Sequence, residues 1–470
     1  MEYTNFDYIH EIYLAQVSFK NEAKKITAVD RVNLLKKLKV TILQKENDIK
    51  SAIFKDFRKN PIETETTEIL ASVLEINHFI KYLKKWMKPK SVSSSLLFAT
   101  TSAKLIYEPK GNTLIITPWN YPFQLPIVHL VASISAGNTV ILKLSEFTPQ
   151  INTVLKDIIA AVFTPNHVAI VEGAVPESTH LLGLKFDHIH FTGSPAVGKI
   201  IMEAAAKNLT DITLELGGKS PVLVDKNVNI RKTVQNLIWA KFVNMGQTCI
   251  APDYLIVDKS IEQEFDSVCK EEIKNAFGSY AQQSVDLARI INSKQYERLE
   301  SYLQELQNTT AEFIVHGQND KSSLFIHPTV LKNFPLDCKL MQEEIFGPIL
   351  PIIYYKDVQE ALDIIRQKEK PLALYIFSSD KKYIQHILDN TSAGGTTIND
   401  AMIHIIHPNL PFGGVNNSGI GQSLGIYGFK AFSHERATLQ AHIFPMSKLF
   451  WYPYTQKSKN MIQYIKKLFA

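Results

Sequence analysis

The chain has 470 residues, 45% of them hydrophobic, and a formal net charge of +5. A chain of this size can bury a large core and is expected to divide into two or more domains. The charge is mild for the length, and no basic stripe with interleaved aromatic residues is present, which argues against nucleic acid as a partner.

Cysteine usage and the distribution of apolar residues narrow the class further. The three cysteines, Cys249, Cys269 and Cys338, include no CxxC pair. Such a count is typical of a reducing compartment rather than of a disulfide framework or a structural zinc site. Residues 1–10 lack the basic-then-apolar order of a signal peptide, and the most apolar run, 125–144, is interrupted by polar residues. We therefore expect a soluble cytoplasmic protein.

The first ninety or so residues are expected to be helical. Thr27 and Asp30 form a capping-box-like start before an apolar residue in every turn. A second helix is expected at 63–87, where the apolar residues lie along one face. Residues 91–107 then turn from polar to β-prone, which indicates an extended arm that pairs with a partner or with a second domain.

From residue 110 short apolar strands alternate with helices. Strands are expected at 113–117, 139–144, 168–171 and 188–192, and helices at 121–136, 148–163 and 195–207. This alternation indicates a parallel sheet with helices on both faces. Such sheets bind ligands at the carboxyl ends of their strands. Those ends carry Trp119, Asn120, Lys143, Glu146, Gly193, Ser194, Glu215 and Gly217.

The turn at 191–199, F-T-G-S-P-A-V-G-K, is ambiguous by itself. Gly193 and Gly198 have the separation of the outer glycines in the dinucleotide fingerprint, but Pro195 takes the place of the middle glycine and removes a donor. The turn fits either a phosphate-binding turn or an ordinary strand-to-helix turn. If it binds a dinucleotide, Ser194 and the N-terminus of the following helix must supply the donors.

Two side chains in the second half are candidates for catalysis. Glu215 stands between apolar residues beside a Gly-Gly turn, which predicts a raised pKa and a role as general base. The alternative is a half-exposed carboxylate at a strand end. Cys249 follows a glycine and two polar residues in N-M-G-Q-T-C-I-A-P (244–252), which suits a nucleophilic thiol with an open approach. The alternative is a buried, inert cysteine.

The remaining elements continue the α/β pattern. Helices are expected at 230–244, 262–277, 293–307 and 358–368, strands at 254–257, 313–315, near 331, 349–354 and 374–377, and a glycine-rich loop at 411–421. Between them, 341–348 contains a carboxylate pair followed by an aromatic residue and a turn.

Seven motifs, in one order, resemble the NAD(P)-dependent aldehyde dehydrogenases across nearly the whole chain. They are P-W-N-Y-P (118–122), L-K-L-S-E (142–146), F-T-G-S-x-x-x-G-K (191–199), L-E-L-G-G-K (214–219), G-Q-T-C (246–249), E-E-I-F-G-P (343–348) and P-F-G-G-V-x-N-S-G (411–419). The short N-terminus, R-I-I-N (289–292) and the extended C-terminal tail resemble the class 3 or fatty-aldehyde branch.

The resemblance implies an α/β fold with a doubly wound Rossmann-like cofactor domain, a second α/β catalytic domain and a small β oligomerisation arm. It assigns 1–90 and 110–217 to NAD(P) binding, 218–417 to the catalytic domain, 91–109 and 433–442 to the oligomerisation element, and 448–470 to an amphipathic C-terminal tail.

The resemblance also implies catalytic roles. Cys249 would attack the aldehyde carbonyl, and Asn120 would join the backbone N–H of Cys249 as the oxyanion hole. Hydride transfer to the nicotinamide would leave a thioester, and Glu215 would activate the water that hydrolyses it.

The cofactor contacts follow in the same way. Glu344 would hold the nicotinamide ribose beside Phe346, Lys143 and Glu146 would meet the adenine ribose, and Trp119 and Ser194 would contact the pyrophosphate region. Gly193, Gly198, Leu216 and Gly217 complete the expected cofactor-binding set. NAD is the expected cofactor, with NADP possible. Two residues depart from the family pattern, since Leu144 replaces a proline and Asn416 a glycine.

No metal site is expected. His188 and His190 share one face of a strand, but no third ligand follows at a suitable spacing.

The expected function is the oxidation of medium- or long-chain aliphatic or aromatic aldehydes to carboxylic acids, by a homodimer. The rivals are a dehydrogenase that hands the thioester to coenzyme A, and a catalytically silent structural or ligand-binding relative. The tail, with an apolar face and four lysines, has three interpretations: packing on its own subunit, weak contact with a membrane surface, or covering the substrate entrance of a partner subunit.

Overall fold

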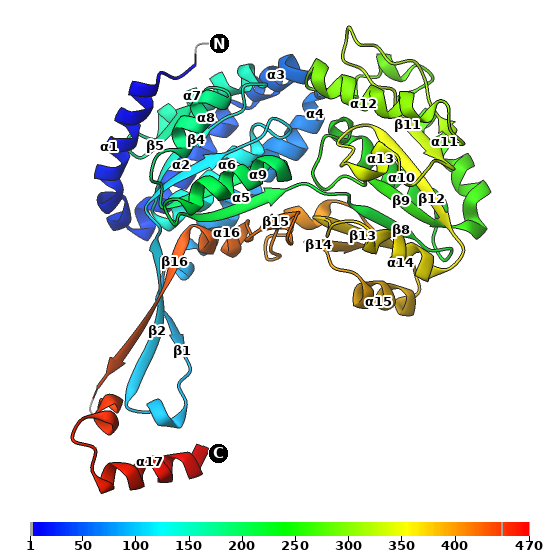
Figure 1. The fold of residues 1–470 in the computed structure, drawn as a ribbon. Coiled ribbons are helices and arrows are strands. Elements are labelled where there is room, and N and C mark those ends of the chain that lie inside the picture. The colour runs from blue at the N-terminus through cyan, green and yellow to red at the C-terminus, as the bar shows by residue number, and fades with distance from the viewer. Residues whose placement is uncertain (1–2, 443–444, 470) are drawn as a thin grey trace.

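The computed structural model describes residues 3–442 and 445–469. Figure 1 shows a body of two lobes, each built on a sheet, and an arm that projects away from the body. Met1–Glu2, at the start of the expected cofactor-binding domain, and Ala470, at the end of the expected tail, lie outside the described residues. No helix in the described ranges is long and apolar enough to cross a membrane.

The first lobe contains a six-stranded sheet in the order β15-β7-β6-β3-β4-β5. Its strands are β3 (Asn112–Ile116), β4 (Thr139–Lys143), β5 (Val168–Val171), β6 (His188–Gly193), β7 (Asp211–Leu216) and β15 (Gly419–Ile420). All of these pairs are parallel except that of β15 with β7. The edge strand β15 is therefore supplied by a segment about two hundred positions later in the chain than its neighbour.

Helices cover both faces of this sheet. Successive side chains of each strand point to opposite faces, so apolar neighbours along a strand need helices on both faces to be buried. Ile115 packs in one core with α2 (Ala28–Gln44), α3 (Glu46–Phe57), α5 (Ala71–Trp86), α6 (Gln124–Ala136) and α7 (Pro149–Val162). Leu114 and Ile116 pack in another core with α1 (Phe6–Lys25), α8 (Val175–Leu182) and α9 (Pro195–Ala206). The predicted doubly wound α/β architecture is confirmed.

The strand order reverses direction between β3 and β6. From β3 the chain adds β4 and β5 on one side, and then β6 and β7 on the other. At such a switch point the loops diverge and leave a crevice outside the carboxyl ends. The loop carrying Trp119 and Asn120 and the turn carrying Gly193 and Ser194 leave the sheet there, as the sequence predicts.

The second lobe contains a seven-stranded sheet in the order β10-β11-β12-β9-β8-β13-β14. Its strands are β8 (Pro221–Val224), β9 (Tyr254–Asp258), β10 (Glu312–Val315), β11 (Thr329–Lys332), β12 (Ile349–Tyr355), β13 (Ala373–Phe377) and β14 (Gly395–Ile398). Its helices are α10 (Ile230–Phe242), α11 (Glu262–Phe277), α12 (Ser293–Leu306), α13 (Lys339–Gln342), α14 (Val358–Arg366) and α15 (Lys381–Asn390). Only four residues, 217–220, separate β7 from β8, so the chain passes directly from one sheet to the other.

The helix expected at 63–87 is interrupted by a wider turn. It consists of α4 (Pro61–Thr64), a π-helical segment (Glu65–Leu70) and α5. The wide turn places Glu68 in the interior, where its carboxylate accepts hydrogen bonds from the Lys59 ammonium (3.0 Å) and from the backbone N–H groups of Phe123 (3.0 Å) and Gln124 (2.9 Å). Phe123 offers α6 no side-chain cap, so Glu68 caps this helix from a distance.

The arm is a three-stranded antiparallel sheet of β1 (Lys90–Val92), β2 (Thr101–Pro109) and β16 (Ser433–Ala441). The register of β2 and β16 runs unbroken over nine residue pairs. An extended element is therefore present where the sequence predicted one. The last helix, α17 (Gln456–Phe469), lies at the far tip of the arm, well away from both lobes (Figure 1).

Candidate active site

Cys249 is presented by a sharply bent segment that follows α10. Asn244, Met245 and Gly246 all have left-handed φ angles, of 52°, 54° and 72°. A Cβ atom on Gly246 would collide with the carbonyl oxygen of Gly347, so only glycine fits there. The bend reverses the chain and directs Cys249 toward the carboxyl end of the first sheet.

Asn120 and the cysteine segment are joined by hydrogen bonds. The Asn120 side-chain amide donates to the carbonyl of Gln247 (3.0 Å), and the Asn244 amide donates to the carbonyl of Asn120 (2.8 Å). One hydrogen of the Asn120 amide is used in this way, and an amide carries two. The structure therefore ties Asn120 to the segment that carries Cys249, two residues away from the thiol.

Glu215 is the penultimate residue of β7 and is buried. Its Oε1 accepts from the hydroxyl of Ser423, and its Oε2 accepts from the hydroxyl of Thr192 (3.2 Å). Burial opposes ionisation, but His129 and these two hydroxyl donors outweigh it and hold the pKa of Glu215 below its ordinary value. The expected raised pKa is wrong, because its apolar sequence neighbours do not reveal the donors that other elements supply.

Cys249 and Glu215 line one cavity of about 1320 Å³. Most of its other lining side chains are apolar, among them Leu70, Leu74, Leu125, Val128, Ile238, Trp239, Phe242, Ile403 and Ile406. Burial, with the carboxylates of Glu344 and Glu215, raises the pKa of the Cys249 thiol above its ordinary value. The resting thiol is therefore protonated at neutral pH.

On the other side of Cys249 lie the residues expected to meet the nicotinamide half of a cofactor. The Glu344 carboxyl packs so closely against Gly217 that a Cβ there would collide with it. Burial, and then the charge of Asp253, raises the pKa of Glu344 to about 8. The rings of Phe346 and Trp119 meet edge to face with centroids 5.5 Å apart. These four predicted residues are thus brought together.

The turn after β6 is an N-capped helix start. The Ser194 hydroxyl accepts from the backbone N–H of Val197 (3.4 Å), so Ser194 is the N-cap of α9. Gly198 lets this helix approach β7 closely, since a Cβ would stand 2.8 Å from the Leu216 side chain. Gly193 is the last residue of β6. Pro195 carries no N–H and that of Val197 is used by the cap, which leaves the N–H of Ala196 as the donor of the first turn.

Lys143 and Glu146 follow β4 at the same edge of the sheet. Lys143 is buried and donates to the carbonyl of Leu144 (2.7 Å). Burial lowers the pKa of Lys143, with the charge of Glu146 opposing.

Comparison with known proteins decides the family. The model for the aldehyde dehydrogenase family matches residues 2–438. The chain belongs to the aldehyde dehydrogenase family. Over 439 residues it is 41% identical to the 4,4'-diaponeurosporen-aldehyde dehydrogenase of Staphylococcus aureus, covering 93% of this chain and 94% of the relative.

A second relative of this aldehyde dehydrogenase is the "dimeric NADP-preferring" enzyme of Rattus norvegicus, 40% identical over 420 residues, covering 89% of this chain and 91% of the relative. A solved structure titled "Substrate bound state of Staphylococcus Aureus AldH" superposes with a TM-score of 0.93 at 40% identity, covering 98% of this chain and 99% of that one. The protein is therefore an enzyme, an oxidoreductase that acts on aldehydes.

Sequence reasoning missed the residues that hold the Glu344 loop of this aldehyde dehydrogenase in place. Lys219 donates to Asp253 and to two backbone carbonyls, one within α13 (Leu340) and one just after it (Glu343). Asp253 in turn accepts from the N–H of Ile345 (2.9 Å), and Arg298 donates to the Ile345 carbonyl (2.8 Å). Of these residues only Lys219 belongs to a recognised motif, L-E-L-G-G-K. Its partners could not be identified from the sequence, because they lie far away along the chain.

Proposed function

We propose that this aldehyde dehydrogenase oxidises medium- and long-chain apolar aldehydes to carboxylic acids through a covalent intermediate on Cys249. The observation that carries the proposal is that the Cys249 thiol and the Glu215 carboxylate line one large cavity, while the Asn120 amide is hydrogen-bonded to the segment that carries Cys249. Catalysis of this kind needs a nucleophile, an oxyanion donor and a base within reach of one carbonyl group.

The first step is attack of the Cys249 sulfur on the aldehyde carbon, which gives a thiohemiacetal. The oxyanion is stabilised by the free hydrogen of the Asn120 amide and by the backbone N–H of Cys249. Because the Cys249 thiol is protonated at rest, its proton must be released to solvent as the sulfur bonds to the carbonyl carbon.

The residues at the strand ends fit a nicotinamide dinucleotide. Gly217 has no side chain, so its backbone lies directly against the Glu344 carboxyl. The start of α9 offers backbone N–H to a pyrophosphate. Glu344, Phe346 and Trp119 would hold the nicotinamide half, Ser194 with Gly193, Gly198 and Leu216 the pyrophosphate turn, and Lys143 with Glu146 the adenine ribose. When bound, NAD(P) supplies the hydride acceptor that converts the thiohemiacetal into a thioester.

Glu215 completes the cycle by taking a proton from the water that attacks the thioester. Its carboxylate is oriented by Ser423 and Thr192 and lines the cavity that holds the acyl group. Hydrolysis releases the carboxylic acid and restores the thiol.

Replacing Glu215 with glutamine is the test of this assignment. The first turnover should give a rapid burst of NADH, while steady turnover falls by about 10²–10⁴-fold, because only hydrolysis needs the base. Stopped-flow absorbance of NADH with decanal measures both phases. Coenzyme A, added in parallel, should not restore the rate.

Glu75→Gln is the matched control, since Glu75 also lines the cavity and accepts a backbone hydrogen bond from Gly425 (2.7 Å). Its steady turnover should stay close to that of the wild type. Loss of the burst in step with steady turnover in Glu215→Gln would show that Glu215 is not chiefly the deacylation base.

We expect NAD to be preferred over NADP, because the Glu146 carboxylate accepts a hydrogen bond from a ribose 2′-OH and repels a 2′-phosphate. Glu146→Gln should shift the ratio of kcat/KM values toward NADP by about tenfold, the equivalent of one lost charge contact. Steady-state kinetics with both cofactors measure the ratio. A wild-type enzyme that favours NADP, as the name of the rat relative states for that protein, would contradict this prediction.

The apolar cavity and the tail together suggest how alkyl chains are bound. Three apolar side chains that line the cavity are about half exposed to solvent: Leu74 (48%), Trp239 (47%) and Ile406 (56%). The tail helix α17 lies at the tip of the arm (Figure 1), so it can cover an entrance only on a partner subunit of a homodimer.

Deleting residues 454–470 should raise KM for decanal by about tenfold or more, the equivalent of two methylene groups that are no longer buried. KM for a short aldehyde and for the cofactor should stay unchanged. Equal changes for both aldehydes would point to destabilisation, and loss of binding to anionic vesicles would point to a membrane contact.

A further inference from the structure

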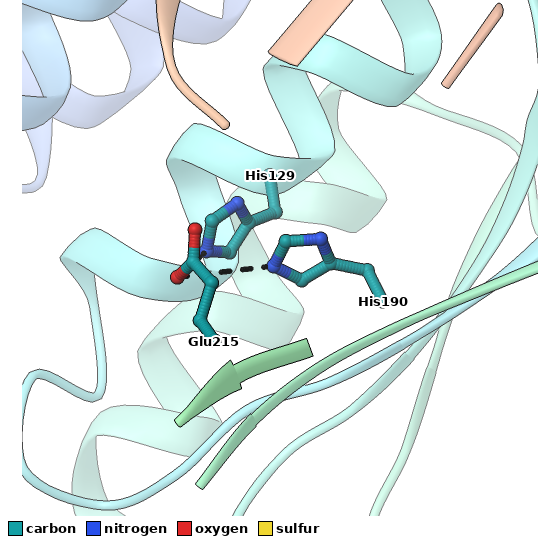
Figure 2. A group of neighbouring side chains, drawn as sticks. All are labelled: His129, His190 and Glu215. Atoms are coloured by element: carbon teal, nitrogen blue, oxygen red, sulfur yellow. Dashed lines mark ion pairs between the residues drawn. The ribbon is translucent and has the colours of Figure 1, made fainter. Parts of the chain in front are cut away.

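Three buried side chains with metal-binding atoms converge next to the catalytic thiol. Figure 2 shows His129 from α6, His190 from β6 and Glu215 from β7 directed toward one another. The Glu215 Oε2 lies 3.3 Å from His129 Nε2 and 4.0 Å from His190 Nε2. One ligand atom from each residue lies within 4.8 Å of the others.

Both ring nitrogens of His190 lack a hydrogen-bond partner among the described residues, although the side chain is fully buried. The His129 side chain is 2% exposed, and among the same residues its Nε2 has only the Glu215 carboxylate, at 3.3 Å, as an ion-pair partner. Buried polar atoms are normally paired. His188, two residues away on β6, is equally buried, but its Nδ1 pairs with Asp211 at 2.8 Å. Both ring nitrogens of His188 are thus paired, since its Nε2 also meets the Thr213 hydroxyl (3.3 Å), whereas neither ring nitrogen of His190 is paired within the described ranges.

The donor set matches a zinc-type divalent cation. Two imidazole nitrogens and one carboxylate oxygen are the ligands of open zinc sites, with metal–ligand distances of about 2.0–2.2 Å. Ligand atoms of a tetrahedral site then stand about 3.3 Å apart, which is the distance between His129 and Glu215. His190 Nε2 lies 4.0 Å from the same oxygen, and the three ligand atoms lie within 4.8 Å of one another, so they would have to approach by at most about 1.5 Å. Ser423 holds the other carboxylate oxygen, and Oε2, which also accepts from the Thr192 hydroxyl (3.2 Å), is the oxygen nearest to the two imidazoles.

We propose that His129, His190 and Glu215 form an inhibitory binding site for a divalent zinc-type cation that enters through the substrate cavity. Glu215 lines that cavity, which provides the route. While Glu215 is coordinated, its lone pairs are directed to the metal and it cannot take a proton from water. The inhibitory effect, unlike the binding site, rests on the proposed role of Glu215 as the deacylation base.

Binding is tested on the full chain carrying Cys249→Ser, which removes the thiol as a competing ligand. Titration with Co²⁺ should produce visible d–d absorption bands that saturate at one ion per chain and disappear on addition of Zn²⁺. Adding His190→Phe, which keeps an aromatic ring but no ligand, should weaken Co²⁺ binding by at least about 100-fold. Adding His188→Asn instead should leave it unchanged.

His129→Asn serves as a second variant if His190→Phe fails to fold, which circular dichroism would reveal. The proposal is overturned if Cys249→Ser shows no d–d bands, or if the bands are equal with and without the histidine ligand.

Kinetics separate the site from the role of Glu215. Zn²⁺ added to the wild-type enzyme should leave the NADH burst intact and suppress steady turnover, and His190→Phe should be about 100-fold less sensitive. A burst that vanishes with turnover would place the inhibitory metal on Cys249 and overturn the proposal. If Co²⁺ binds as expected but Glu215→Gln hydrolyses the thioester normally, the binding site stands and the proposed base is wrong.

Discussion

Replacing Cys249 with serine is expected to lower kcat for aldehyde oxidation by at least about 10³-fold while cofactor binding is retained. A serine hydroxyl with no dedicated base is a far poorer nucleophile than a thiol. The bend at residues 244–246, which presents position 249, depends on backbone geometry and on Gly246 rather than on sulfur. The folded site should therefore survive the substitution.

Cys338→Ser is the matched control. Cys338 is buried and occupies the N-cap position of α13, where serine is a favoured residue. Its turnover should stay close to that of the wild type. NADH formation measures turnover, and quenching of tryptophan fluorescence by the cofactor measures binding. Near-normal turnover by Cys249→Ser would refute the covalent mechanism.

Replacing Glu68 with alanine is expected to lower the free energy of unfolding by about 3–5 kcal/mol. The substitution leaves the ammonium of Lys59 buried without its nearest charged partner, since both side chains are fully buried. It also removes the acceptor for the N–H groups of Phe123 and Gln124. The helix that follows Asn120 would thereby lose the cap on its first turn.

Glu65→Ala provides the comparison within the same π-helical segment. Glu65 pairs with Lys50 at the surface, and its side chain is 52% exposed. An exposed pair of this kind contributes about 0.2–1 kcal/mol. Urea unfolding followed by circular dichroism measures both variants. Similar small losses in the two would mean that Glu68 neither caps α6 nor anchors Lys59.

The elements that the sequence predicts well are those whose evidence is local. The apolar strands at 113–117 and 188–192 carry short buried runs, and the helices between them repeat every turn. Because parallel strands end at one edge, the motif residues after them lie close together, and Asn120 there donates to Gln247, in the segment that carries Cys249. The helix α8 was missed, since its eight residues begin with Val-Pro and are capped by Glu177 at the backbone N–H of Ala174.

Contacts between distant segments were not predictable in the same way. The pKa of Glu215 depends on Ser423 and on His129, which come from opposite ends of the chain. His190 was compared with His188 on its own strand, whereas its partners in space are on α6 and β7. Glu68 has no sequence signature as a cap, because the helix it caps begins more than fifty positions later.

The arm has a consequence for how the chain is made. Its long strands come from opposite ends of the sequence, and the Thr438 hydroxyl donates to the carbonyl of Lys104 across 334 positions. During synthesis β2 leaves the ribosome long before β16 is made. The backbone N–H and C=O groups along the β16-facing edge of β2 therefore stay unpaired in the meantime. Short β1 covers only one side of it over three residues. The nascent chain thus carries an unpaired strand edge for most of its translation. Chains terminated before Ser433 would keep that edge and self-associate through it.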